Sequence, residues 1–134
     1  MKNFSLFRRV ASLVLPVSLL LFAGTLAADT LSDKVVNDIV AHSYDKHVVQ
    51  QKEFETLTGA KKLTPAGDAV KQKKELGTIV EEVAKSGTKK VLTGGRTAYY
   101  DATENILVIH NANNEAQSTV FRPTNGQAYV NGLK

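Results

Sequence analysis

The chain has 134 residues, the length of one ordinary domain, and a formal charge of +4 from 17 basic and 13 acidic residues. It contains no cysteine, which excludes a disulfide-stapled scaffold and every cysteine-based metal or redox motif. The HExxH zinc pattern is also missing from the sequence. Without disulfides, the fold must rely on an ordinary hydrophobic core.

Residues 1–27 have the pattern of a secretory signal peptide. Three basic residues precede an apolar run at 10–22, and small residues follow up to Ala27. A positive segment, a short apolar segment and a small-residue cleavage site are the three parts of such a signal. We therefore predict cleavage after Ala27, a secreted or periplasmic location, and no stable membrane association after cleavage. The alternative is retention of the segment as an uncleaved anchor.

Loss of this segment changes the charge balance. It carries three of the basic residues and no acidic one, so residues 28–134 keep fourteen basic and thirteen acidic side chains, a net charge of +1. That balance argues against a globally basic nucleic-acid binder. A phosphate site would have to come from local basic clusters, and such clusters are more often simply solvated.

The first predicted helix starts after capping residues at 29–32 and extends towards Phe54. Its apolar stripe falls on one face at spacings of three and four, through Val36, Val40, Ser43 and His47. Lys46 directly precedes His47, and His42 lies four residues before Lys46, so three basic side chains gather over one turn. The alternative interpretation of this turn is a core histidine beside a solvated lysine.

A loop and a second helix are expected next. Two glycines and Pro65 break the pattern between residues 59 and 67, which predicts a lysine-bearing surface loop. The segment KKELGTIVEEVAKSG then predicts a helix that ends at Gly87. Its core face contains Leu76, Ile79, Val80 and Val83.

After Gly94 and Gly95 the sequence changes to short runs rich in β-branched and aromatic residues: RTAYYD, NILVIHN, STVFRP and QAYVNGL. Short polar turns separate these runs, which predicts antiparallel hairpins. Helices first and strands last indicate an α+β fold. We expect residues 28–134 to form a single domain, with N-terminal helices packed on one face of a four-stranded antiparallel meander sheet that begins at Arg96.

Arg96 and Arg122 each stand at the end of a predicted strand, among several hydroxyl side chains. A single arginine in that position more often makes a structural salt bridge. Two of them, facing a helix that carries a Lys-His pair, favour a site that holds a phosphate group.

The motif order resembles a family of bacterial toxins. The segments AHSYDKHVVQQKEF, GGRTAYYD, ILVIHN and TVFRPTNGQAYVNGL are similar to the C-terminal domains of contact-dependent growth inhibition and related polymorphic toxins, with a layout like that of colicin D. The resemblance covers roughly residues 40–133. It implies the fold shared by barnase-like, EndoU-like and RelE-like ribonucleases. A short chain with its own signal departs from toxins that form the tail of a large protein, which leaves the delivery route open.

The resemblance also implies an activity and its partners. The chain would be a metal-independent endoribonuclease without a cofactor, with RNA as substrate, tRNA being one candidate, and a cognate immunity protein as partner. His47 matches the catalytic histidine and Lys46 the adjacent basic residue, while Arg96, Thr119 and Arg122 match polar positions of the toxin motifs.

RNA cleavage without metal requires three kinds of group. A base takes the proton of the 2′-hydroxyl, an acid protonates the leaving 5′-oxygen, and cations hold the phosphate. Histidine suits acid or base work because the ordinary pKa of imidazole lies near neutrality. The lysine and the two arginines would hold the developing charge, and Thr119 would donate a hydrogen bond to a phosphate oxygen.

Three further residues complete the predicted site. His42 would be a second acid or base, and Tyr99 or Tyr100 would stack on a base or share the acid role. His110 lies within a predicted strand and is expected to be an ordinary strand residue. A metal site built from the three histidines is the weaker alternative, because nothing in their spacing demands one.

Two rival functions remain open from the sequence. One is a secreted binding module without enzymatic activity, whose contact surface would consist of Tyr99, Tyr100, Phe121 and Tyr129. The other is an inactive relative of the toxins that still binds RNA or an inhibitor. Convergence of His47, Arg96 and Arg122 in one cleft favours an enzyme, whereas dispersal favours a module.

Overall fold

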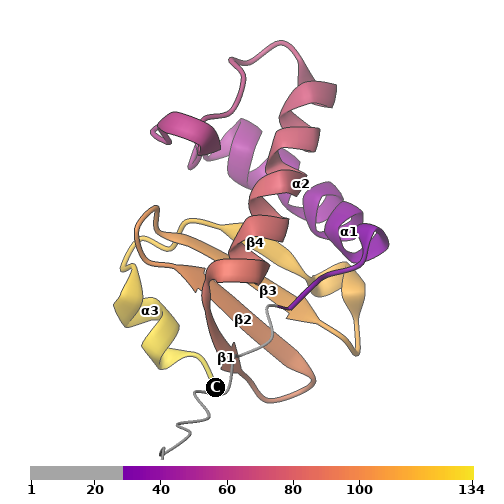
Figure 1. Ribbon diagram of the computed structural model, residues 1–134, viewed down its shortest axis with the longest axis vertical. Helices are drawn as coiled ribbons and strands as arrows, with labels where there is room; N and C mark the ends of the chain where they lie inside the picture. The colour runs from indigo at the N-terminus through magenta and orange to yellow at the C-terminus, as the bar shows by residue number, and fades with distance from the viewer. Residues whose placement is uncertain (1–28) are drawn as a thin grey trace, which may run out of the picture.

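The computed structural model describes residues 29–134, and the predicted signal segment lies outside them. Its helical part contains α1 (Asp33–Ser43), the π-helix η1 (Tyr44–Gln50), the 3₁₀ turn η2 (Gly59–Lys61) and α2 (Ala69–Ser86). The remainder contains β1 (Thr88–Val91), β2 (Arg96–Asp101), β3 (Ile106–Asn111), the 3₁₀ turn η3 (Glu115–Gln117), β4 (Thr119–Phe121) and α3 (Gln127–Gly132) (Figure 1).

Capping side chains fix the starts of the two long helices. The hydroxyl of Ser32 accepts the N–H of Val35 at 3.4 Å, and the carboxylate of Asp68 accepts the N–H of Lys71 at 2.9 Å. Helix α2 ends at Ser86, and the N–H of Gly87 donates to the carbonyl of Val83. Both helices follow the predicted apolar stripes, which the buried faces confirm.

The first helix is not α-helical as far as Phe54. From Tyr44 it widens into a π-helix, and the N–H of Gln51 bonds the carbonyl of Lys46, five residues back, at 2.9 Å. Tyr44, His47 and Val48 are buried in this segment, at the spacing of three and four that also places residues on one face of an α-helix. π-Turns are rare and occur frequently at functional sites. The prediction of a regular helix is therefore wrong for this segment.

The four strands form one antiparallel sheet in the order β1-β2-β3-β4. Tyr99 pairs with Val108, which in turn pairs with Val120. The predicted α+β meander is confirmed, but the sheet begins at Thr88 rather than at Arg96. The prediction of a strand at QAYVNGL is wrong, because this segment contains α3.

A fifth strand has no place beside β4, because side chains from the helical half already occupy the outer edge of that strand. The N–H of Val120 donates to the hydroxyl of Ser43 at 2.8 Å, and the N–H of Arg122 donates to the carboxylate of Glu53 at 2.8 Å. Occupied edge donors cannot pair with another strand. The C-terminal segment therefore packs on a face of the sheet instead.

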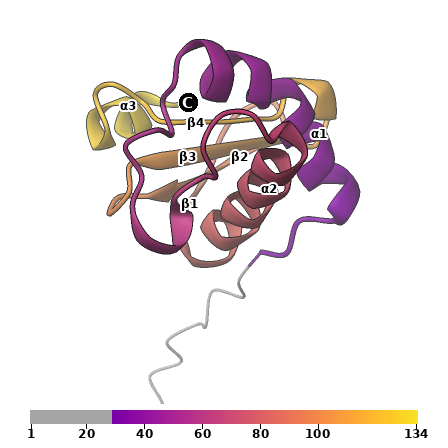
Figure 2. The same ribbon diagram turned by 90° about the horizontal axis from the view of Figure 1, so that it is seen from above.

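Helices cover both faces of the sheet, although only one covered face was expected (Figure 2). α1 and α2 pack on the face that carries Tyr99, Ile106, Val108 and Val120. On the opposite face, Val130 of α3 packs with Ala98, Tyr100, Leu107 and Ile109. The first of these clusters also contains Tyr44 and Val48 of η1 and Val120 of β4, and the junction of these two elements contains the predicted catalytic histidine.

Candidate functional site

His47 lies against the edge strand β4. The π-helix directs its side chain toward the sheet, where the imidazole stacks on Phe121 with ring centroids 5.5 Å apart and an interplanar angle of 25°. Only 11% of the side chain is exposed. The ring is therefore held by packing, as in the core-histidine alternative, and it does not stand free in an open cleft.

Glu53 fixes the orientation of this imidazole. Its Oε1 lies 3.0 Å from Nδ1 of His47, and its Oε2 accepts the N–H of Arg122 at 2.8 Å. The N–H of Glu53 also donates to the carbonyl of His47 at 2.9 Å, which holds the two residues together. One carboxylate thus joins the histidine to the edge strand. The sequence analysis missed Glu53, although an acid six residues after a histidine was a visible signal.

The other ring nitrogen of His47 is left for solvent or a ligand. Nε2 makes no hydrogen bond to any residue in 29–134, and it is not among the buried unpaired side-chain atoms of that range. A histidine with one nitrogen held by a carboxylate and the other accessible is the arrangement that general acid–base catalysis uses.

Arg122 lies next to this pair but serves mainly as a brace. Its Nη1 donates to the carbonyl of Glu53 at 2.8 Å and to the hydroxyl of Thr56 at 2.6 Å, and its Nε donates to the carbonyl of Glu104 at 3.1 Å. Its Nη2 has no hydrogen-bond partner among the described residues. Arg122 therefore keeps one N–H pair, on Nη2, that the described residues leave unpaired.

Arg96 does not join this group. It pairs with Asn111 at one end of the sheet, while Phe121 pairs with Leu107 near the other end. Five strand positions separate Arg96 from the level of Arg122, about 16 Å at the usual rise of a strand. The guanidinium of Arg96 instead donates to the carbonyls of Thr93 and Lys134, at 3.0 and 2.9 Å. The predicted convergence of both arginines with His47 is not present: only Arg122 lies beside the histidine, and the dispersal of Arg96 is the outcome that favours a binding module.

The remaining polar candidates lie along the same helix and strand. The hydroxyl of Thr119 is 3.1 Å from the hydroxyl of Ser43, which is buried one turn before His47. Thr119 and Phe121 share one face of β4, because alternate residues of a strand do. His42 and Lys46 are both exposed, and neither makes an ion pair within residues 29–134. Lys46 is therefore an exposed cation next to the histidine in the sequence.

Neither tyrosine of β2 is available to stack on a base. Tyr99 and Tyr100 are only 3% and 4% exposed. The hydroxyl of Tyr99 donates to Asp29 at 2.7 Å, and that of Tyr100 donates to Asn105 at 2.8 Å. Burial and the neighbouring Asp29 carboxylate raise the pKa of Tyr99, which keeps its phenol neutral. The same burial removes both rings from the contact surface that a binding module would use.

The three histidines do not meet. His47 faces β4, His42 is exposed, and His110 lies in β3 with its Nε2 buried and unpaired. Within the described part of the chain, no three His, Cys, Asp or Glu side chains gather closely enough to hold a metal ion.

No family model, curated protein or solved structure matches this chain. The toxin resemblance therefore rests on the sequence motifs alone. Residues 29–134 contain no helix with the length and apolar character needed to cross a bilayer.

Proposed function

We propose that the protein is a secreted, metal-independent endoribonuclease in which His47 is the acid–base residue and Glu53 positions it. The pairing of Nδ1 with Glu53, which leaves Nε2 without a hydrogen-bond partner among the described residues, carries this proposal. The motif resemblance supplies the reaction class.

The Glu53 contact matters for the chemistry because it selects a tautomer. A carboxylate that accepts a hydrogen bond from Nδ1 keeps the proton there, so Nε2 has a free lone pair. Nε2 can then take the proton of a 2′-hydroxyl as that oxygen bonds to phosphorus, and the nearby negative charge stabilises the imidazolium that forms. The bond from phosphorus to the 5′-oxygen breaks, the 5′-oxygen takes a proton from solvent, and the products are a 2′,3′-cyclic phosphate and a 5′-hydroxyl.

The phosphate would be held by groups on the same side of the molecule. Nη2 of Arg122 and the ammonium of Lys46 supply positive charge beside His47, and the Thr119 hydroxyl lies on the same face of β4 as Phe121. Arg96, Tyr99 and Tyr100 drop out of the proposed site, because they lie at the far end of the sheet or within the core. His42 is exposed and makes no hydrogen bond or ion pair with His47 among the described residues, so it is not part of the proposed site.

Incubation of residues 28–134 with total RNA in excess EDTA tests the proposal. We expect cleavage to proceed, and His47→Gln to lower the rate at least about 100-fold, the usual contribution of a positioned acid or base. Because His47 is packed, its loss also destabilises the fold, so rates are compared per folded molecule.

Val120→Ala is the matched control. It removes buried volume from β4, the strand against which His47 packs, without changing the imidazole. Such a change typically lowers the free energy of unfolding by about 1–3 kcal/mol. Its folded molecules should cleave at the normal rate. Equal rates per folded molecule for His47→Gln and the unaltered chain would refute the proposal. RNA binding without cleavage would instead support the inactive-relative alternative.

A further inference from the structure

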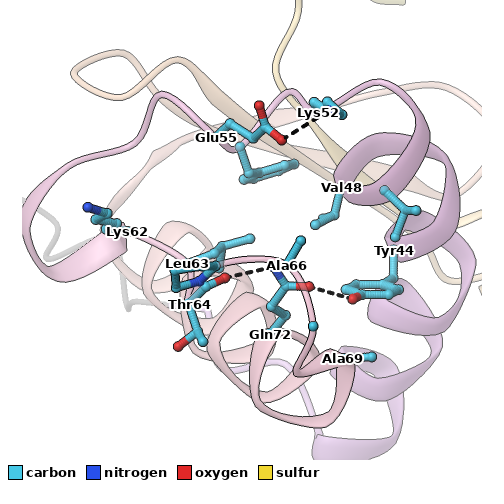
Figure 3. A pocket seen from close by; sticks show the side chains of 14 residues that line it. Tyr44, Val48, Lys52, Glu55, Lys62, Leu63, Thr64, Ala66, Ala69 and Gln72 are labelled. Atoms are coloured by element: carbon cyan, nitrogen blue, oxygen red, sulfur yellow. Dashed lines mark hydrogen bonds and ion pairs between the residues drawn. The ribbon is translucent and has the colours of Figure 1, made fainter.

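A cavity of about 640 Å³ opens on the side of η1 that faces α2 (Figure 3). η1, the turn that follows it, the 62–67 loop and the first residues of α2 enclose it. Most of its wall is apolar, from Val48, Phe54, Leu63, Pro65, Ala66 and Ala69. His47 points away from this cavity toward β4, so the cavity is separate from the candidate site.

The polar groups in the wall bond to one another. The hydroxyl of Tyr44 donates to Gln72 at 2.6 Å, and the amide nitrogen of Gln72 donates to the carbonyl of Thr64 at 2.7 Å. Glu75 accepts both the N–H and the hydroxyl of Thr64, at 2.6 and 2.7 Å. These bonds hold the loop in place and keep the cavity open. With its polar groups already paired, the wall favours an apolar occupant.

The rim carries an excess of positive charge. Lys52 lies 3.7 Å from Glu55, and Figure 3 shows this pair together on one side of the opening. Lys62 also lines the cavity, and it has no ion-pair partner among the residues that the structure describes. Val49, 52% exposed, extends the apolar surface at the mouth. An apolar interior beside one unpaired ammonium is complementary to an amphipathic anion.

We propose that this cavity binds a small amphipathic carboxylate, with its hydrocarbon body against Val48, Phe54 and Leu63 and its carboxylate at Lys62. The volume falls within the range of about 300–1,000 Å³ that is usual for small-molecule sites. The inference is independent of the ribonuclease proposal, because it uses the opposite side of η1.

Titration of the ¹⁵N-labelled chain with decanoate tests this assignment. We expect saturable amide shifts confined to residues 44–55 and 62–72, with weaker binding at high salt. Lys62→Gln should weaken decanoate binding about fivefold, the upper range for an exposed ion pair. Lys71 is exposed and lies outside the cavity wall, so Lys71→Gln should leave the affinity for decanoate unchanged. Decanol should bind to Lys62→Gln and to the unaltered chain equally. Decanol binding as tightly as decanoate would overturn the role of Lys62.

A cavity-filling pair provides the second test. Ala69 lines the cavity at the exposed start of α2, while the neighbouring Val70 is 83% exposed and lies outside the wall. Ala69→Phe should abolish the decanoate shifts, and Val70→Phe should preserve them. Shifts that persist in Ala69→Phe, or an absence of saturable shifts in the unaltered chain, would overturn the site. Changes in the same amides on dilution without decanoate would identify a second copy as the occupant and also overturn it.

Discussion

At the scale of single residues, the side chains predicted to bind phosphate mostly hold the protein together. An arginine at a strand end finds unpaired backbone carbonyls nearby, and both Arg96 and Arg122 donate to such carbonyls. Only Arg122 does so beside His47. The residue that organises this region is Glu53, since its two oxygens serve two different elements.

Replacement of Glu53 by Gln should therefore affect stability and rate together. Glutamine has one side-chain oxygen, so either His47 or the N–H of Arg122 loses its acceptor. We expect unfolding to become easier by about 1–3 kcal/mol, the cost of a buried group left unpaired. The cleavage rate should fall through kcat while KM changes little, because Glu53 does not contact the RNA.

Glu55→Gln is the control for this change, measured by urea unfolding and by steady-state cleavage of RNA. Glu55 is two residues away, and its side chain is 62% exposed. An exposed substitution of this kind stays within about 0.5 kcal/mol. Identical unfolding curves for the two variants would contradict the bridging role of Glu53.

The sequence predicted the Lys-His turn but not which residues accompany it. Strand periodicity places Tyr99 and Tyr100 on opposite faces of the sheet, and helices were expected on only one face, which would leave the other face, here the one that carries Tyr100, open. That face is closed by α3, whose segment had been interpreted as a strand. The partners of a side chain depend on such long-range packing, which local patterns do not contain.

At the scale of elements, the errors have physical causes. The segment Thr88–Val91 was not predicted as a strand because two of its four residues are lysines, which are uncommon in strands. Their ammonium groups are held elsewhere: Lys89 pairs with Asp29, and Lys90 donates to the carbonyls of Val130 and Asn131. The π-helix was not predicted because the apolar positions keep the α-helical spacings of three and four as far as His47. The wider turn shows only in the hydrogen bond from Gln51 to Lys46, which lies beyond that stripe. Helix α2, with its long stripe and Gly87 at the end, carried the clearest local signal: its core face and its end were predicted correctly, but it begins at Ala69, four residues before the predicted segment.

Two glycines at α2 allow a paired prediction. Gly77 lies inside the helix, and a Cβ there would meet Val36 at 3.5 Å, an ordinary contact. Gly77→Ala should stabilise the protein by about 0.5–1 kcal/mol, because alanine loses less conformational entropy in a helix. Gly87 joins α2 to β1, and a Cβ there would lie 2.6 Å from the carbonyl oxygen of Val83 and 3.1 Å from the backbone of Tyr100.

Gly87→Ala should therefore destabilise the protein, by about 1–3 kcal/mol for overpacking against backbone that cannot move aside. Thermal unfolding of the two variants measures the difference directly. A higher melting temperature for both would show that the α2–β1 junction is looser than its contacts indicate.

At the scale of the whole molecule, three of the carboxylates that tie separate segments together have a lowered pKa. Asp29 pairs with Lys89 at 2.6 Å and anchors the start of the described chain to the sheet. Glu75 holds the 62–67 loop through Thr64. Asp101, at the end of β2, pairs with Lys61 of η2 at 2.5 Å. Each tie requires an ionised carboxylate, so the arrangement of the fold depends on pH.

The pKa of each carboxyl is lowered, for a different reason in each case. Hydrogen bonds from Lys89 and then from Tyr99 lower the pKa of Asp29, and the N–H and hydroxyl of Thr64 lower that of Glu75. Burial acts to raise the pKa of Asp101, but Lys61 and the backbone N–H groups of residues 103 and 104 outweigh it. Stabilisation from a lowered carboxyl pKa is present above the unfolded value and is lost as the pH falls through the folded value.

Acid unfolding should follow from these ties. Carboxyls in the unfolded chain titrate near pH 4, so we expect stability to be level above about pH 5 and to decline below about pH 4.

Asp101→Asn should lower stability at pH 7 and make the decline shallower, because the Lys61 tie is already gone. The Asp101 side chain is only 16% exposed, so solvent screens the Lys61–Asp101 pair less than it screens a pair on the surface. Urea unfolding at pH 7, 5, 4 and 3 measures both effects, with the exposed Asp45→Asn as control. If Asp101→Asn and Asp45→Asn declined in parallel with the unaltered chain, the Lys61 tie would contribute nothing to acid stability. The decline would then have to come from other carboxylates, Asp29 and Glu75 among them, and Glu75→Gln would test the one that holds the loop beside the cavity.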